Sequence, residues 1–320
     1  MSKALASVVI CAWNNWPDLE MAIESALNQS YQPLEVIVVD NASTDSTPEQ
    51  VARRYGGRLL YLVQPNKDTA GAYNTGFDAS SGEFIQFLDG DDVLAPDKID
   101  RQAAVLAGDP GVDMVYGEIC AFQSATGPAC WTIPPTHKEA DMLMAILTSA
   151  LGICTDLGML YRRSALVKVG PWDESLYVED LDYLLRAAWS GCRFEYCPDG
   201  PTGFARVHRK SKTQNSRAMN LGNEAVWSKA LGFITREPYR RLLREKLGRL
   251  RLAMALAPDQ PDRLSATRML DLARATAPWA MPAIAYAAAW AALTVPGGRA
   301  MARSPMLRSI RQALVAGSAR

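Results

Sequence analysis

The stretch EFIQFLDGDD, Glu83–Asp92, runs from an apolar segment straight into three carboxylates within four positions. The apolar segment is typical of a buried strand. Adjacent carboxylates repel one another unless a cation shares them, and divalent cations prefer hard oxygen ligands. Asp89, Asp91 and Asp92 are therefore candidate metal ligands, with Gly90 as a small residue that leaves room for a ligand. On spacing alone, an acidic loop that caps the following helix is an equally good interpretation.

Three similar apolar runs precede this stretch, and helical patterns separate them. The runs are SVVICAW (Ser7–Trp13), LEVIVVD (Leu34–Asp40) and RLLYLVQ (Arg58–Gln64). Strands that alternate with helices predict crossover connections and a mostly parallel sheet. Ligands of such sheets bind outside the carboxyl ends of the strands. We therefore expect Trp13, Asp40 and Asp89 to meet at one edge of the sheet.

The helix after the second run has a clear start signal. Thr47 is its expected N-cap, with Pro48 at the first helical position and Gln50 at the third, which is a capping box. Later in the chain, VDMVYGEICAF (112–122) predicts a strand and EDLDYLLRAAWSG (179–191) a helix. From about residue 220 the pattern predicts helices only.

Charge is distributed unevenly along the 320 residues, although 34 Lys and Arg balance 34 Asp and Glu. From Arg206 onward 21 basic residues face 6 acidic ones, a balance of +15, whereas residues 1–205 hold 13 basic and 28 acidic ones. This asymmetry predicts two parts with different partners. No aromatic motif is interleaved with the basic residues, which argues against a nucleic-acid partner.

The six cysteines follow neither the CxxC spacing of a zinc site nor a disulfide framework, and they favour a reducing cytoplasm. The N-terminus lacks the charged segment and long apolar stretch of a secretory signal. Neither GxGxxG nor GxxxxGK[ST] is present. A phosphate-bearing ligand would therefore need a cation instead of a glycine cradle.

Four motifs in order make the chain resemble a known enzyme family. They are SVVICAWNN, LEVIVVDNASTDST, GEFIQFLDGDD followed by PDK, and EDLDYLLRAA. Together they resemble the inverting family 2 glycosyltransferases over roughly residues 5–215. The resemblance implies an α/β fold of the GT-A type, Rossmann-like, with a mostly parallel central sheet flanked by helices. It also implies metal-dependent transfer of a sugar from a nucleotide-sugar donor, with UDP-sugars favoured, to an acceptor hydroxyl.

The resemblance divides the chain into a catalytic domain, residues 1–218, and a C-terminal all-helical extension, residues 219–320. The nucleotide-sugar part covers about 1–95 and the acceptor part about 96–218. Trp13 stands where the family has an aromatic that packs against the base, and Asp40 where an acid hydrogen-bonds the base. A core aromatic and a turn-capping acid are the alternatives. The predicted donor-binding residues are Cys11, Ala12, Trp13, Asn14, Asp40, Lys67, Asn74, Asp89 and Gly90.

Two departures from the family pattern affect the donor site. Asn41 and Ala42 replace the commoner second acid and glycine after Asp40. Before Asn74, Tyr73 stands where the family often has Arg. The phosphate contacts of that Arg are then expected from Lys67 or from the basic stretch Arg206, Arg209, Lys210 and Lys212.

The resemblance also implies the metal ligands, which are Asp91, Asp89 and His208, with Asp92 in support. The implied cofactor is Mn²⁺ or Mg²⁺. A lone histidine is otherwise more often structural, and His208 is one of only two in the chain.

Inversion requires a base that takes the proton of the attacking hydroxyl. The resemblance implies that Asp180 is this base and that Glu179 orients it or binds the acceptor. Two adjacent carboxylates raise the pKa of one of them by mutual repulsion, which suits a base. Acids at a helix N-terminus are also favoured by the helix dipole alone. Asp156 lies in a segment that resembles the family's acceptor entrance.

The tail combines an uncharged, alanine-rich stretch, residues 276–298, with a basic amphipathic one, residues 299–320. This combination favours peripheral docking on an anionic membrane, at the inner face of the plasma membrane. Packing on the catalytic domain, or on a second copy as a homodimer, is the alternative.

Function therefore has three interpretations. The first is a glycosyltransferase with a saccharide or lipid-linked acceptor, in surface polysaccharide or glycolipid assembly. The second is a non-catalytic nucleotide- or carbohydrate-binding module on the same fold. The third, a phosphatase with an aspartyl nucleophile, lacks the expected placement of its acids on the first strand.

Overall fold

The computed structural model of the chain describes residues 3–65, 68–122, 131–133, 141–148, 156–208, 211–255 and 263–277. These residues form two compact units. The first contains the described residues up to 142 and those from 156 to 214, and the second contains those from 143 to 148 and from 215 onward. Residue 218, the domain boundary predicted from sequence, falls within the helix Ser216–Phe233.

One sheet forms the centre of the first unit, with strand order β3-β2-β1-β4-β8-β6-β9-β5 and with β7 paired to β6. The half from β3 to β4 is parallel, whereas β8 runs antiparallel to both β4 and β6. The parallel half coincides with the regularly alternating part of the sequence. The strands are β1 (Ala6–Ala12), β2 (Leu34–Asp40), β3 (Leu60–Val63), β4 (Phe84–Asp89), β5 (Val93–Leu94), β6 (Met114–Phe122), β7 (Trp131–Ile133), β8 (Met159–Arg162) and β9 (Phe194–Arg206).

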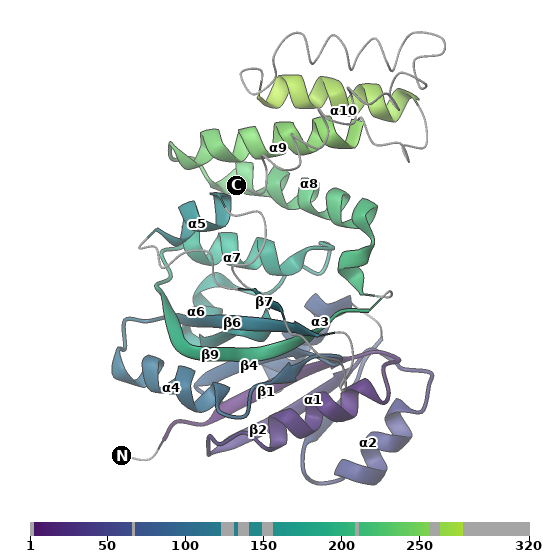
Figure 1. Cartoon of the computed structure of the whole chain (residues 1–320), viewed down its shortest axis with the longest axis vertical. Coiled ribbons are helices and arrows are strands. Elements are labelled where there is room, and N and C mark those ends of the chain that lie inside the picture. Colours follow the sequence, from purple (N-terminus) through teal and green to yellow (C-terminus); the bar gives the residue numbers. More distant parts are fainter. Residues whose placement is uncertain are drawn as a thin grey trace. The chain divides into compact units, whose positions relative to one another are not determined.

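Helices connect these strands and flank the sheet (Figure 1). The α/β fold class predicted from the sequence is confirmed. The helices of the first unit are α1 (Asp18–Leu27), α2 (Thr47–Tyr55), α3 (Asp68–Ala79), α4 (Lys98–Gly108), α6 (Arg163–Val169) and α7 (Glu179–Trp189), with 3-10 turns at Asp156–Gly158 and Lys212–Gln214.

Alternate residues of β1 face opposite sides of the sheet. Val8 and Ile10 belong to the fully buried cluster that α1 and α4 also line. Val9 faces α3, where a Cβ atom placed on Gly76 would lie only 2.1 Å from Cγ1 of Val9. Glycine at this position therefore lets α3 pack directly on the strand.

The carboxyl ends of the parallel strands coincide. In the register of β1 with its two neighbours, Ala12 lies opposite Asp40 of β2, and Cys11 lies opposite Asp89 of β4. The expected meeting of Asp40 and Asp89 at one edge of the sheet is confirmed.

The start of α2 differs from the prediction. Ser46 occupies the N-cap and makes no capping hydrogen bond with its side chain. The backbone N–H of Thr47 donates instead to Oδ1 of Asp45, at 3.0 Å. The predicted capping box of Thr47 and Gln50 is wrong, because an acid two residues earlier already serves the first free amide of the helix.

The second unit is helical where it is described. α8 (Ser216–Phe233), α9 (Tyr239–Ala255) and α10 (Arg263–Thr276) pack in sequence order, and α5 (Met142–Thr148) begins at the boundary between the units. Arg251 of α9 joins the three long helices, since it pairs with Glu224 at 2.6 Å and donates to Oγ1 of Thr276 at 2.5 Å. Among the described residues, no helix is both long and apolar enough to cross a membrane. The described residues end at 277, so the part of the predicted docking tail beyond residue 277 lies outside them.

Candidate active site

Asp89, Asp91 and Asp92 meet at the carboxyl end of β4, and one oxygen from each carboxylate lies within 4.8 Å of the others. The imidazole of His208, which follows β9, lies against this group, with 3.0 Å between its Nε2 and Oδ2 of Asp91. Carboxylates and an imidazole are ligands that suit Mn²⁺, and the carboxylates also suit Mg²⁺. The residues present therefore fit the predicted cation, and their binding of it stays a prediction.

Arg206 holds this acidic loop in place. Its backbone N–H donates to Oδ1 of Asp92 at 2.8 Å, and its Nε donates to the carbonyl of Asp91 at 3.0 Å. The guanidinium also lies 3.4 Å from Asp18 and over the ring of Phe122. With its side chain only 9% exposed, Arg206 serves as a structural anchor. Its backbone N–H and its Nε are used inside the protein, and the expected contact of Arg206 with phosphate stays a prediction.

Packing of the protein itself requires a small residue at Gly90. A Cβ atom at this position would lie 2.4 Å from Nδ2 of Asn15 and 2.7 Å from the carbonyl oxygen of Cys11. The space on the Cβ side of Gly90 is thus filled by the loop after β1, and contact of Gly90 with a ligand stays a prediction. Close approach of these two loops is what requires glycine.

Tyr73 of α3 reaches the acidic loop from the other side. Its hydroxyl donates to Oδ1 of Asp89 at 2.9 Å, and its ring packs on Phe87 with 4.7 Å between centroids. The Asp89 side chain is exposed to solvent, although protein atoms surround its carboxylate. Burial there, and then the nearby Asp91, raise the pKa of Asp89 to about 6. Tyr73 thus supports an acid, where the family often places an Arg.

Lys212 supplies positive charge to the same site. Its Nζ lies 2.9 Å from Oε2 of Glu179 and 3.6 Å from Oδ2 of Asp68. These carboxylates raise the pKa of Lys212, although burial of its ammonium group alone would lower that pKa. Burial raises the pKa of Asp89 and of Asp180, and the Lys212 ammonium offsets part of that rise. Lys67, Arg209 and Lys210, the other basic candidates, lie outside the described residues.

The acceptor-side acids gather at the start of α7. Burial and the adjacent Asp180 raise the pKa of Glu179 to about 7, and burial also raises the pKa of Asp180. Asp156 is 8% exposed and accepts a hydrogen bond from the hydroxyl of Tyr161 at 2.5 Å. Burial and then Asp180 raise the pKa of Asp156 well above its usual range, and Asp89 adds to this rise. The predicted base and the predicted entrance acid therefore act on each other and on the acidic loop.

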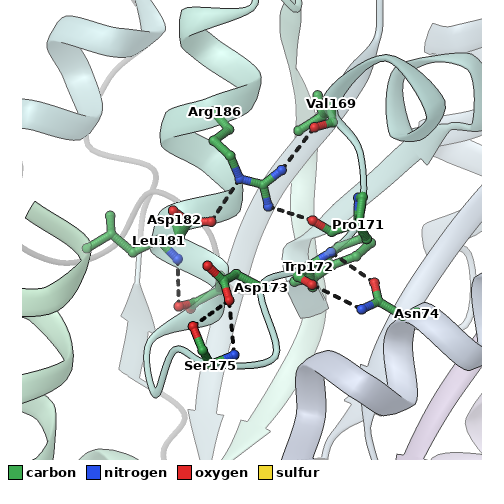
Figure 2. Close-up of polar contacts among 10 residues, drawn as sticks. Asn74, Val169, Pro171, Trp172, Asp173, Ser175, Leu181, Asp182 and Arg186 are labelled. Carbon is green, nitrogen blue, oxygen red and sulfur yellow. Dashed lines mark hydrogen bonds and ion pairs between the residues drawn. The ribbon is translucent and has the colours of Figure 1, made fainter. Parts of the chain in front are cut away.

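The loop before α7 is pinned from two helices, as Figure 2 shows. Asn74 of α3 exchanges two hydrogen bonds with the main chain of Trp172, at 3.0 and 2.9 Å. Arg186 of α7 pairs with Asp182 at 2.8 Å and donates to the carbonyls of Val169 and Pro171. Asn74 thus has a structural task, and its predicted contact with the donor stays a prediction.

On the nucleotide side, Trp13 follows β1 and is 55% exposed, so it is not a core aromatic. The next residue, Asn14, joins two loops: its Oδ1 accepts from the backbone N–H of Thr44 at 2.6 Å and of Asp45 at 3.2 Å. Its own N–H donates to Oγ of Ser43 at 2.9 Å. The exposed indole of Trp13 therefore stands at a rim formed by the loops after β1 and β2, which Asn14 joins.

Asp40 lies beneath this rim with no exposed surface. Its Oδ1 accepts from the N–H and the hydroxyl of Ser43, at 2.8 and 2.6 Å, and its Oδ2 accepts from the hydroxyl of Tyr61. The alternative of a turn-holding acid is thus realised, and contact with a base stays a prediction. Of the other predicted donor residues, Ala12 is buried, and Cys11 accepts from the Asn41 amide at 3.6 Å.

Comparison with known proteins identifies the family of the chain. The family description "Glycosyl transferase family 2" matches residues 7–170, just over half of the chain. The chain belongs to this family. A protein of Rickettsia prowazekii described as an uncharacterized glycosyltransferase is 27% identical over 241 residues, which is 73% of each chain.

Solved structures of two glycosyltransferases share the GT-A fold with this family 2 chain. One is Staphylococcus aureus TarS 1–349 in complex with UDP-GlcNAc, with TM-score 0.64 and 17% identity over 98% of this chain and 88% of that one. The other is the mannosyltransferase PcManGT from Pyrobaculum calidifontis with GDP-Man and Mn²⁺, with TM-score 0.58 and 22% identity over 99% and 86%.

Sequence reasoning missed several residues of this family 2 site. Tyr73 was noted only as a departure, and Tyr161 and Asp68 were not considered. Lys212 was one of five basic candidates, and no sequence signal singled it out. The contacts of Tyr73, Asp68 and Lys212 join segments far apart in the sequence, such as the 33 positions that separate Glu179 from Lys212, whereas Tyr161 bonds an acid near it in the chain.

Proposed function

We propose that the chain is a metal-dependent, inverting glycosyltransferase that moves a sugar from a nucleotide-sugar donor, with UDP-sugars favoured, to an acceptor hydroxyl. One observation carries the proposal. The pair of Asp91 and His208 adjoins Asp89, which lies within electrostatic reach of Asp180 and Lys212. Candidate metal ligands and a candidate base thus share one site in one unit.

Asp91, Asp89 and His208 would hold Mn²⁺ or Mg²⁺, with Asp92 supporting the loop. When bound, the ion neutralises charge that develops on the leaving diphosphate. Lys212 adds a positive charge of the protein itself on the side of Asp68 and Glu179.

Asp180 is the proposed base. As the acceptor oxygen bonds to the anomeric carbon, Asp180 takes the hydroxyl proton, and the bond from that carbon to the phosphate oxygen breaks. The electron pair of the broken bond leaves with the nucleoside diphosphate. Because burial raises the pKa of Asp180, its carboxylate accepts a proton more readily than an exposed one. Glu179, held by Lys212, would orient Asp180 or bind the acceptor, and Asp156 would line the acceptor entrance.

The proposed acceptor is a saccharide or a lipid-linked saccharide in surface polysaccharide or glycolipid assembly. The proposed location is the cytoplasm, with peripheral contact at the inner face of the plasma membrane. The support is the +15 charge balance from Arg206 onward, which suits anionic lipid or a lipid diphosphate.

The test combines binding with turnover on the full chain. Thermal unfolding is measured with UDP, GDP, dTDP and CDP, each with and without Mn²⁺, because a ligand of the folded state stabilises it. Hydrolysis and transfer are then followed with UDP-GlcNAc and GDP-mannose. We expect one nucleotide to stabilise the protein only with metal and the matching donor to be turned over.

Two variants separate the roles in this test. Asp91→Asn should abolish the metal-dependent shift, whereas Asp180→Asn should keep the shift and lose turnover. Asp78→Asn, an exposed acid on α3, is the matched control and should change neither. Full turnover by Asp180→Asn would refute the mechanism, and binding without turnover of any donor would favour the binding module.

A further inference from the structure

Lys98, the first residue of α4, has no exposed surface at all. Its Nζ donates to Oε1 of Gln102 at 2.5 Å, to the carbonyl of Met159 at 2.7 Å, and to Oε1 of Gln86. All three acceptors are neutral. Burial of an ammonium group without a paired carboxylate carries a large desolvation cost, and burial lowers the pKa of Lys98 well below its usual range.

The acceptors of Lys98 share a second set of partners. Nε2 of Gln86 donates to the carbonyl of Asp156 at 3.0 Å, and Nε2 of Gln102 donates to the carbonyl of Gly158 at 2.8 Å. Lys98 itself donates to the carbonyl of Met159. The carbonyls of Asp156, Gly158 and Met159 therefore all accept hydrogen bonds from one buried network. The backbone of the turn at 156–159 is thus fixed from three points.

This turn presents Asp156 to the acids of the candidate site. Its carboxylate accepts from Tyr161 and interacts electrostatically with Asp180 and Asp89. Gln86 lies on β4, the same strand that ends at Asp89. The network thus links the strand of the acidic loop to the turn of the entrance acid.

We propose that Lys98 is a positioning residue of the enzyme, which holds Asp156 in place relative to Asp180 and Asp89 through Gln86, Gln102 and Met159. The proposal rests on the function proposed above in assigning Asp156 to the working site. Lys98 itself touches no substrate.

The first experiment needs no activity. Hydrogen exchange is followed by mass spectrometry on the full chain, comparing Lys98→Met with the parent. Loss of the network should speed exchange in the segment 156–162 by about tenfold, because local opening becomes easier there. Ala104→Gly, which weakens the same helix at an exposed position, is the control and should leave that segment's exchange unchanged relative to its neighbours.

The second experiment measures hydrolysis of UDP-GlcNAc or GDP-mannose, whichever the parent turns over. Lys98→Met should lower kcat by about 100-fold, as expected for a displaced catalytic geometry, with the donor KM little changed. The double variant Lys98→Met/Gln102→Met replaces both polar partners by apolar groups and should regain thermal stability. Its kcat should remain low.

Three outcomes would overturn the proposal. They are unchanged exchange at 156–162 in Lys98→Met, recovery of kcat together with stability in the double variant, and full activity of Asp156→Asn. If the parent turns over no donor, the proposed function fails, while the exchange measurement still decides whether Lys98 holds the turn.

Discussion

The hydroxyl of Tyr73 donates a hydrogen bond to Oδ1 of Asp89, and the two oxygens are 2.9 Å apart. Burial and Asp91 raise the pKa of Asp89 to about 6, and this hydrogen bond from Tyr73 keeps the rise smaller than it would otherwise be. A buried tyrosine thereby helps an acid of the candidate metal site to stay ionised.

Tyr73→Phe should therefore weaken metal-dependent nucleotide binding in a pH-dependent way. Without the donor, the pKa of Asp89 moves up, so the Mn²⁺-dependent thermal shift should shrink at pH 6 and recover toward pH 8. The fold should lose about 1 kcal/mol, the usual value of one hydrogen bond. Tyr183→Phe is the matched control, because the buried Tyr183 hydroxyl has no hydrogen-bond partner among the described residues. An equal loss at both pH values would contradict the prediction.

Metal affinity should depend on His208 as well as on the acids. His208→Ala should weaken Mn²⁺ binding by about 10- to 100-fold, the loss typical of a group in or beside a coordination shell. The measurement is Mn²⁺ titration followed by nucleotide-dependent stabilisation. Unchanged Mn²⁺ affinity would make the contact between His208 and Asp91 structural only.

Stability of the metal-free protein should fall as pH rises through the titration of Glu179. The pKa of Glu179 in the folded state is about 7, above the ordinary 4.5, so its contribution is complete below about pH 4.5 and is lost by about pH 7. Glu179→Gln should remove part of this dependence, at most about 3 kcal/mol between these limits. Urea unfolding at pH 5 and pH 8 measures the difference. If the free energy of unfolding changed equally with pH in the parent and in Glu179→Gln, the pKa of Glu179 would not be raised in the folded state.

Ala42 has a backbone φ of 57°, in the left-handed region, at the position where the family commonly has glycine. Ala42→Gly should therefore stabilise the protein by about 1 kcal/mol. Ala104→Gly, at an exposed helical alanine of α4, should destabilise it by about 1 kcal/mol. Thermal unfolding of the pair tests both signs, and a loss of stability in Ala42→Gly would refute the strain argument.

Gly90→Ala should disrupt the acidic loop. Its new methyl group would overlap Asn15 and the carbonyl of Cys11, at a cost of about 1–3 kcal/mol for overpacking, and the metal-dependent nucleotide shift should be lost. Gly108→Ala is the control, because among the described residues no atom beyond its chain neighbours and its own helix backbone lies within 4 Å of the added group. That variant should be neutral or slightly more stable. Retained nucleotide binding in Gly90→Ala would show that the loop can move.

The sequence predicted those parts of the molecule that depend on neighbouring residues. The bounds of β2 match the predicted run, since an apolar segment between polar ends leaves little choice. Asp40 and Asp89 were expected together because the ends of adjacent parallel strands coincide. The contacts of Tyr73 with Asp89 and of Lys212 with Glu179 were not predicted, since they depend on how a helix or a loop packs against the sheet. The capping box at Thr47 was wrong because Asp45 competes for the same amide.

Asn14 unites the loops after β1 and β2 through its backbone N–H and its single side-chain oxygen. These loops therefore lose their conformational freedom when the protein folds, before any ligand arrives. A base that packs on Trp13 would meet a surface of settled shape. The protein would then select the base that fits this preformed surface. A change of base selectivity would require redesign of both loops together.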